Sequence, residues 1–390
     1  VIVLGELDEA DKACPGCGGV LGEMKDQFES SEIVDVVEVQ YRIVESRRKK
    51  YRCGCGACVD TALPDPSAPE TIIQGGRYSV DFAAKVAIDK YAHHLPLERQ
   101  VRIMAQHGLI ASSQTLWDQV YALATQLEPT WNQLLASLLA EPVIGIDTTG
   151  WPRLDDKNGK KWQMWCIAGA ADVFHRIRDD KSAATFADLI GSYKGVVVAD
   201  QAGTNTAGAR DGPGIRLVAC WAHVFRKFAE VQDDHPEATR MLEFIGRLYA
   251  IDRHAQSEEE RAELRRTKST EVLTEMKAWL GKTTPIMATD FGKAIRYTVN
   301  AWPALRAFVD DPKIWLDNNP TERGLRGPVV GRRNHFGSKS ERGTQVASIL
   351  YSLIESAKGR GVDPAKYLAA AVAEARRGAI LLPAAFADNA

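Results

Sequence analysis

Short apolar runs between residues 141 and 235 alternate with polar segments at the spacing of β-strands. Five of these runs predict strands, and one longer run, between the third and fourth strands, has the spacing of a helix. In chain order they cover residues 142–146, 161–167, 173–177, 182–190 (the helix), 195–199 and 215–219. This order of elements predicts a mixed α/β fold.

Helical spacing dominates before this region. Leu97, Val101 and Met104 share one helical face, and Gly108 is placed to end that helix. Ser113 can cap a second helix, whose apolar positions are Leu116, Val120, Leu123 and Leu127. Two short helices around a glycine turn resemble a helix-turn-helix, a pattern compatible with plain packing as well as with DNA binding.

Residues 236–312 look wholly helical and therefore predict a helical insertion. Within them, a run of mixed charge over residues 258–266 is most simply a solvated helix face. Two more apolar helices follow near the end of the chain. The second of them follows Pro364, and the first carries Val346, Leu350, Leu353 and Ile354.

The cysteines are concentrated at the start of the chain. Five of the seven lie in the first 58 residues, in the turn Cys14-Pro-Gly-Cys17-Gly and in the cluster Cys53, Cys55 and Cys58. Soft thiolates on two turns, joined by strand-like residues 33–39, predict a zinc ribbon in place of disulfides. Four of the five thiols would hold one structural Zn²⁺, and the sequence leaves open which two of the last three bind.

Composition narrows the class of protein without giving a function. The chain has 390 residues, of which 45% are hydrophobic and 26% charged, which is typical of a globular protein of several domains. It has no apolar stretch of about twenty residues and no signal-peptide pattern, so we expect a cytoplasmic protein with no membrane segment. A net charge of −2 means that nucleic-acid binding must rest on local basic segments. Because the chain begins at Val1, we also expect residues upstream.

Two aspartates follow two of the predicted strands. Asp147 is the first polar residue after residues 142–146, and Asp200 holds the same position after residues 195–199. Ligands of α/β proteins bind at such strand ends, and adjacent strands would bring the two carboxylates together. Glu322, 122 residues after Asp200, would join them from a helix beyond the insertion. Hard oxygen ligands without a nearby histidine pair favour Mg²⁺ or Mn²⁺.

Three carboxylates suffice to hold two such ions. Together the ions can activate a water or a 3′-hydroxyl and stabilise the leaving oxygen of a phosphodiester. Nucleic acid would also need a cationic path, and the segment after Glu322 is basic, with Glu341 as its only acid up to residue 343. Its candidate phosphate contacts are Arg323, Arg326, Arg332, Arg333 and Lys339.

With these residues in place, the chain resembles the transposases of the insertion sequence 66 family over nearly its whole length. The most specific matching segment is Gly331-Arg-Arg-Asn-His-Phe-Gly-Ser338, which leads to Ser352-Leu-Ile354. The other matching segments are Cys14-Pro-Gly-Cys17-Gly, His94-Leu-Pro-Leu-Glu-Arg-Gln100, Ile146-Asp147-Thr, Cys220-Trp-Ala-His223 with Arg226-Lys-Phe228, and Asp317-Asn-Asn-Pro-Thr-Glu322-Arg.

The resemblance implies a ribonuclease H-like core with Asp147, Asp200 and Glu322 as its acidic triad and two Mg²⁺ or Mn²⁺ ions per site. It implies zinc at the cysteine segments and DNA contacts from Arg226 and Lys227. The implied enzyme is a DNA transposase that cleaves element ends and joins their 3′-hydroxyls to target DNA.

The implied partners are the terminal inverted repeats, the target DNA, a second copy of the chain, since the active form would be at least a dimer, and accessory proteins of the same element. Two positions depart from the family. Thr148 stands where an acidic residue is frequent, and Gln201 stands where a glycine-aromatic pair is usual. Neither departure removes an expected ligand.

The expected fold is therefore an α/β ribonuclease H-like core with a helical insertion, preceded by a zinc ribbon and a helical, helix-turn-helix-like domain. We expect the zinc ribbon at residues 1–62, a linker at 63–76 and the helical DNA-binding domain at 77–140. The core would comprise residues 141–235 and 313–360, split by the insertion at 236–312. A terminal helix and tail would occupy residues 361–390.

Other interpretations stay open at this point. An inactive or domesticated relative could act as a nuclease or a DNA-binding protein, and a zinc-ribbon regulator could carry the same carboxylates as structural residues. His223 fits a capping or packing position as well as a contact in the catalytic site. Trp151, Trp162 and Trp165 fit core packing better than stacking on bases.

Overall fold

The computed structural model describes residues 12–22, 41–45, 50–52, 54–55, 58–60, 69–157, 159–191, 193–200 and 214–388. Contacts between Cα atoms divide the chain into two compact units, residues 1–42 and 43–390, and each is described by itself. Cys53, Gln201 and the strand-like residues 33–39 lie outside the described residues.

The first unit contains the turn that carries Cys14 and Cys17. The amide of Cys14 donates to Gly19 O at 2.7 Å, and the amide of Gly18 donates to Cys14 O at 2.9 Å. Gly18 adopts φ 70°, the left-handed conformation that glycine allows without strain. Backbone amides of Gly16 and Cys17 lower the pKa of the Cys14 thiol. The turn thus favours the thiolate form that a metal needs.

The second unit begins with a short antiparallel hairpin of β1 (Lys50–Arg52) and β2 (Cys58–Asp60). Cys55 lies in the turn between the two strands, and Cys58 opens β2 opposite Arg52. The hairpin therefore brings two of the predicted zinc ligands to one end of a tight turn.

Three helices precede the central sheet: α1 (Val80–Tyr91), α2 (Leu97–Gln106) and α3 (Ser113–Leu138). The prediction of two short helices is wrong for the second, because α3 has 26 residues. Its apolar spacing continues past Leu127 through the buried Trp131 and Leu134, and its N-cap is Ser112 in place of Ser113. Since α3 packs on α1, α12 and α13, its apolar face serves core packing.

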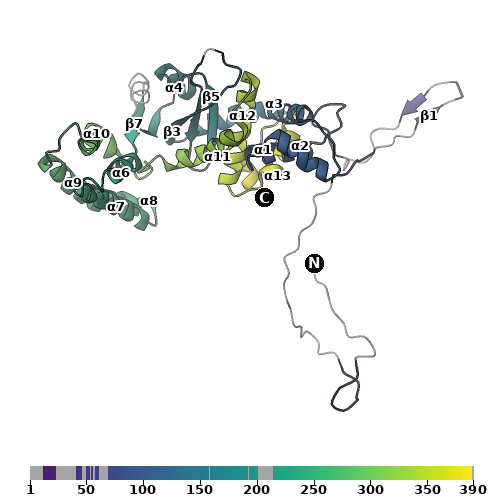
Figure 1. Ribbon diagram of the computed structural model, residues 1–390, viewed down its shortest axis with the longest axis horizontal. Helices are drawn as coiled ribbons and strands as arrows, with labels where there is room; N and C mark the ends of the chain where they lie inside the picture. The colour runs from purple at the N-terminus through teal and green to yellow at the C-terminus, as the bar shows by residue number, and fades with distance from the viewer. Residues whose placement is uncertain are drawn as a thin grey trace. The chain divides into compact units, whose positions relative to one another are not determined.

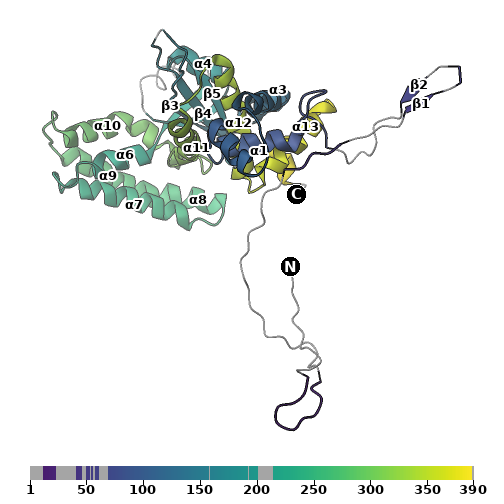
Figure 2. The ribbon, with the colours of Figure 1, turned by 45° about the vertical axis from the view of Figure 1, so that its right-hand side comes forward.

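The sheet has five strands in the order β5-β4-β3-β6-β7. Strands β3, β4 and β5 pair antiparallel, whereas β6 and β7 run parallel to β3. Within the second unit the sheet lies between helices α7–α10 on one side and α1, α2 and α13 on the other (Figures 1 and 2). The mixed α/β class is confirmed. The strands are β3 (Val143–Gly150), β4 (Gln163–Ala168), β5 (Val173–Arg178), β6 (Gly195–Ala199) and β7 (Ile215–Ala219).

The helices that follow the first three strands are consistent with the predicted pattern. Ser182 caps α4 by accepting from the amide of Thr185. Among the described residues, the α-helices between β5 and residue 318 are α4 (Ala183–Ile190), α6 (Trp221–Ala229), α7 (Ala238–His254), α8 (Glu258–Leu264), α9 (Thr270–Lys282) and α10 (Asp290–Leu305). The later ones are α11 (Asn319–His335), α12 (Glu341–Gly359), α13 (Pro364–Arg376) and α14 (Pro383–Ala387).

One expectation about strand β3 is wrong. Asp147 does not end the strand, because β3 continues to Gly150. The parallel pairing with β6 stops at Gly145, but the antiparallel pairing with β4 persists from Gly145 to Gly150. The polar residues after Ile146 therefore belong to a strand that keeps only one neighbour.

The helical insertion departs from expectation at Arg265. The charged run 258–266 was predicted to be a solvated face, yet Arg265 is 1% exposed. It lies in a π-helical turn, η2 (Arg265–Ser269), where Nε donates to Asp252 Oδ1 at 2.6 Å. Its Nη1 donates to the carbonyls of Phe308, Asp311 and Ile314. Arg265 thus joins α7 to the segment that follows the 3₁₀ turn η3 (Ala307–Val309), which leads back to the sheet.

Helix α12 covers the free edge of the sheet. Hydroxyls of three serines spaced four residues apart accept the backbone amides of β5 at 2.7–3.1 Å. The bonds run from Ile177 N to Ser348, from His175 N to Ser352 and from Val173 N to Ser356. Edge amides need such partners when they are buried, and the serines supply them.

Candidate active site

The register of the parallel strands aligns the two aspartates. Val143, Ile144 and Gly145 of β3 pair with Val196, Val197 and Val198 of β6. Continued by two residues, the same register places Asp147 opposite Asp200. Neighbouring strands lie about 4.8 Å apart and residues in register share a face, so both carboxylates project to one side of the sheet.

Two buried cysteines extend this row on either side. Asp147 pairs with Cys166 of β4, and the register of β6 with β7, continued by one residue, places Asp200 opposite Cys220. Both thiols are 0% exposed. Four residues from four strands or strand ends thus form a line across the sheet, with two acids at its centre and two uncharged side chains outside them.

Helix α11 lies directly over this row, because Gly145 permits a close approach. A Cβ at Gly145 would lie 2.1 Å from Thr321 Oγ1 and 2.5 Å from Asn318 Oδ1. Gly145 and Asp147 are two residues apart in one strand, so Asp147 faces the same helix. A Cβ at Gly324 of α11 would likewise lie 3.1 Å from Cys166 Sγ. The row is covered by the first turns of α11.

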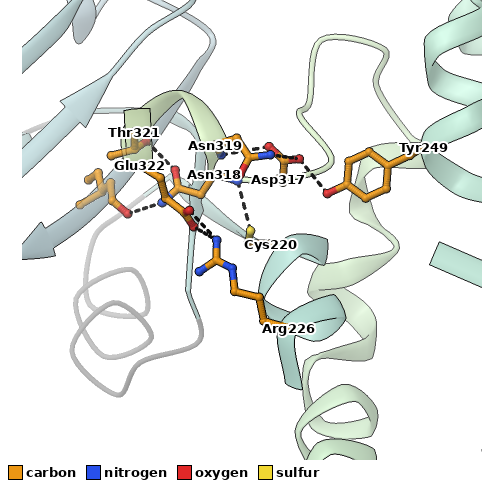
Figure 3. A network of polar contacts seen from close by, with 9 residues as sticks. Cys220, Arg226, Tyr249, Asp317, Asn318, Asn319, Thr321 and Glu322 are labelled. Atoms are coloured by element: carbon orange, nitrogen blue, oxygen red, sulfur yellow. Dashed lines mark hydrogen bonds and ion pairs between the residues drawn. The ribbon is translucent and has the colours of Figure 1, made fainter. Parts of the chain in front are cut away.

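The segment before Glu322 fastens this helix end to the sheet. Asn318 is 0% exposed; its Nδ2 donates to Ile146 O at 3.0 Å and its amide donates to Cys220 Sγ at 3.2 Å (Figure 3). Asp317 accepts the hydroxyl of Tyr249, from α7, at 2.7 Å. The insertion is therefore bonded to the segment that positions Glu322.

Glu322 forms an ion pair with Arg226 of α6. The guanidinium Nη2 donates to both oxygens of the carboxylate (Figure 3). One ligand atom each from Cys220, His223 and Glu322 lies within 4.8 Å of the others. His223 is half-buried, and its Nδ1 has no hydrogen-bond partner among the described residues. It therefore stands beside Glu322 and is not a capping residue.

The charges of the other two carboxylates affect the ionisation of Asp147. Burial raises the pKa of Asp147 to about 6, and the charges of Asp200 and Glu322 add to this shift. The amide of Thr148, which donates to Asp147 Oδ1 at 2.7 Å, and the charge of Lys181 act in the opposite direction. Three like charges gathered in a partly buried place are costly for the fold, which is characteristic of functional sites.

The predicted basic residues fall into separate groups. Arg323, Arg326, Arg333 and Lys339 are exposed. Arg323 lines a cavity of about 740 Å³ between the sheet and the insertion, and Arg326 does not line it. The remaining three are engaged: Arg226 with Glu322, Lys227 with its ammonium 4.8 Å from the centre of the Tyr297 ring, and Arg332 with Thr149.

The three tryptophans are packing residues in the main. Trp151 is 2% and Trp165 1% exposed, so neither can stack on a base. Trp162 is half-buried beneath Arg153, whose guanidinium lies 4.4 Å from the ring centre. Sequence analysis did not single out Phe336, which is 68% exposed at the end of α11.

Comparison with known protein families identifies the family to which this chain belongs. The model for the transposase of the IS66 family matches residues 75–346, and the model for the zinc-finger binding domain of the IS66 transposase matches residues 11–56. The chain belongs to the IS66 family of transposases. It is thus a DNA transposase of an insertion sequence, a DNA-binding and DNA-processing enzyme with a zinc-finger domain near its start.

Three uncharacterized proteins of Sinorhizobium fredii (strain NBRC 101917 / NGR234) are similar to this IS66 transposase. The protein y4jD is 32% identical over 362 residues, covering 87% of this chain and 70% of y4jD. The proteins y4qI and y4hP are 29% and 27% identical over 89% and 87% of this chain, and 68% and 66% of their own lengths. Among the described residues of the transposase, no helix is long and apolar enough to cross a membrane.

Proposed function

We propose that this transposase cuts and joins DNA through two divalent ions held by Asp147, Asp200 and Glu322 in a ribonuclease H-like core. The observation that carries the proposal is the register of β3 and β6, which aligns the two aspartates beneath the first turn of α11. Three antiparallel strands followed by two parallel ones support the ribonuclease H-like assignment.

The donor set fits hard divalent ions. It consists of carboxylate oxygens, and the pKa of Asp147 is raised by burial first and by the charges of Asp200 and Glu322 second, effects that a bound dication would offset. When bound, Mg²⁺ or Mn²⁺ would activate water or a 3′-hydroxyl and stabilise the leaving oxygen. The chain's own contribution is to orient the carboxylates, through the sheet register for the aspartates and through Asn318 for Glu322.

DNA would run along the exposed cations of α11 and its following loop, namely Arg323, Arg326, Arg333 and Lys339. We extend the proposal to residues 77–140 as a second DNA contact and to an active form of at least two copies. The segments 141–235 and 313–360 would form the catalytic domain around the insertion at 236–312. Accessory proteins of the same element would complete the machinery.

The test compares Asp147→Asn, Asp200→Asn and Glu322→Gln with Asp234→Asn, a control on an exposed position between α6 and α7. We expect each site variant to lower Mn²⁺-dependent cleavage of element-end DNA at least about 100-fold, with DNA binding kept within about 3-fold. Cleavage that survives in Asp147→Asn would refute the proposal. Cleavage without any joined product in the wild type would favour the nuclease interpretation.

We also propose one structural Zn²⁺ in the zinc-finger domain, held by Cys14, Cys17 and two of Cys53, Cys55 and Cys58. The lowered pKa of Cys14 supports this, because thiolates bind zinc. Mass spectrometry under native conditions should find one zinc in the wild type and none in Cys14→Ser. Zinc retained by Cys14→Ser would contradict the ligand set, and Cys58→Ser decides whether Cys58 takes part.

A further inference from the structure

The turn after α11 holds a bulky residue in an unusual backbone conformation. Phe336 adopts φ 57°, in the left-handed region, although glycine stands at the next position. A helix commonly ends on a glycine in this conformation, and a bulky residue there is strained. Phe336 is also the most exposed large aromatic side chain among the described residues, at 68%. Phe336 thus exposes its ring to solvent from a strained backbone conformation.

The residue after Phe336 makes a close contact. Gly337 packs against the loop after β3, where a Cβ would lie 2.2 Å from Pro152 O. Gly337 also has a positive φ of 77°, so both its backbone conformation and this contact favour glycine. Two successive left-handed residues thus follow α11, and Phe336 is the one of the two that is strained.

The same contacts make the turn rigid. Ser338 N donates to Pro152 O at 3.0 Å, and Leu154 N donates to Ser338 O at 2.9 Å. The indole of the buried Trp151 donates to Ser338 Oγ at 3.1 Å. Phe336 thus stands on a backbone bonded to the loop that follows β3, so its ring pays little entropy on binding.

The position of the turn relates it to the carboxylates. Arg332, one helical turn before Phe336, donates to Thr149 Oγ1 at 2.9 Å. Thr149 is two residues beyond Asp147 on the same face of β3. Arg333 and Lys339, three residues before and three residues after Phe336 in the sequence, are both exposed. An exposed aromatic residue with cations close to it in the sequence is the composition of a surface that binds a base and its neighbouring phosphates.

We propose that Phe336 stacks on a DNA base that has left the duplex, while Arg333 and Lys339 contact the phosphates beside it. This inference rests on DNA as the substrate, and not on the assignment of the metal ligands. It gives the Gly331–Ser338 segment a role in DNA recognition: Gly331 and His335 pack on Tyr351, and Gly337 and Ser338 fix the turn that presents Phe336. Stacking of this kind accepts any base.

The experiment measures binding of the full chain to two DNA probes in buffer without Mg²⁺ or Mn²⁺, so that cleavage plays no part. One probe is a fully paired duplex, and the other carries one unpaired 2-aminopurine. Phe336→Gly is the main variant, since it relieves the strain and should unfold no earlier than the wild type. Phe336→Trp keeps a stacking face, and Ile286→Ala removes a side chain that is 75% exposed in the insertion, as a control for the loss of exposed apolar surface.

We expect Phe336→Gly to bind the probe with the unpaired base about 10-fold or more weakly and the paired duplex within about 2-fold. Quenching of 2-aminopurine should be lost in Phe336→Gly and kept in Phe336→Trp and Ile286→Ala. Equal binding of both probes by Phe336→Gly and the wild type would overturn the proposal. So would an equal loss on both probes, or a change in oligomeric state that accounts for the loss. Loss of cleavage in Asp147→Asn leaves this result untouched.

Discussion

Helices α11 and α12 follow one another along the chain and cover the same sheet, but they meet it through opposite kinds of buried polar contact. Under α12, the hydroxyls of Ser348, Ser352 and Ser356 accept the amides of β5, so each polar group has its partner. Under α11, Asp147, Asp200 and Glu322 bring like charges together. The serine contacts stabilise the fold, whereas burial and the neighbouring charges disfavour the ionised form of Asp147.

This difference separates a structural contact from a functional one without reference to any family. Buried polar groups that are fully paired specify a fold and tolerate no missing member. Carboxylates that are buried close to one another disfavour their charged forms, and such arrangements are frequent at functional sites. Four predictions probe this contrast.

The largest effect is expected from Gly145→Ala. Its Cβ would lie 2.1 Å from Thr321 Oγ1, so the first turn of α11 must move and carry Glu322 with it. We expect cleavage to fall at least about 100-fold, because a displacement of about 1 Å at a catalytic group has that cost. Gly150→Ala, in the same strand, is the matched control: its nearest neighbour would be Arg332 Nη1 at 3.8 Å. Equal activities of the two variants would show that α11 does not depend on this close approach.

The aspartates could be predicted from the sequence because the period of a strand fixes which residues face together. The separation of 53 residues between Asp147 and Asp200 equals the offset of the β3–β6 pairing, so the acids meet once the strands pair. The end of β3 could not be predicted from the sequence, because β3 remains paired with β4 for several residues after its pairing with β6 has stopped. Polar residues after an apolar run look alike in both cases.

The contacts of α12 could not be predicted in the same way. Apolar spacing gave the helix correctly, but serines four residues apart carry no signal that distinguishes an exposed face from a sheet edge. The ion pair of Arg226 with Glu322 joins residues 96 apart, and no periodicity announces it. Nothing in the periodicity around Phe336 predicts that its side chain is exposed and its backbone left-handed.

Asp147→Asn should stabilise the metal-free protein in a pH-dependent way. The pKa of Asp147 is raised from 3.8 to about 6, so the folded state prefers the protonated acid. The cost is absent below about pH 3.8, grows as pH rises through 6 and is complete above it, at about 3 kcal/mol. Urea unfolding without Mg²⁺ should therefore show the variant more stable at pH 8 and similar to the wild type at pH 4. A gain independent of pH would contradict this origin.

Ser352→Ala should act in the opposite direction. The variant leaves His175 N without its acceptor in a buried place and removes one acceptor of Trp131 Nε1. We expect the free energy of unfolding to fall by about 1–3 kcal/mol, with cleavage per folded molecule unchanged. Ser137→Ala is the matched control, since that hydroxyl only donates to Leu134 O of its own helix. If the fully folded variant lost cleavage activity, Ser352 would have a functional role and not only a structural one.

The smallest effect is expected from a substitution of Arg226. This residue supplies a paired polar contact, as the serines of α12 do, but its partner is Glu322, one of the three acids. Because the guanidinium occupies both carboxylate oxygens, it competes with a metal for them. The pair is partly exposed, so Arg226→Gln should tighten Mn²⁺ binding without DNA only about 2- to 5-fold, as followed by electron paramagnetic resonance. DNA binding should weaken and lose about one unit of its salt dependence, since a phosphate takes over Arg226 in the complex. Arg247→Gln breaks a similar bidentate pair with Glu275 in the insertion and should change neither quantity. Mn²⁺ affinity that is equal in Arg226→Gln and Arg247→Gln would show that Arg226 does not hold Glu322 back from the metal.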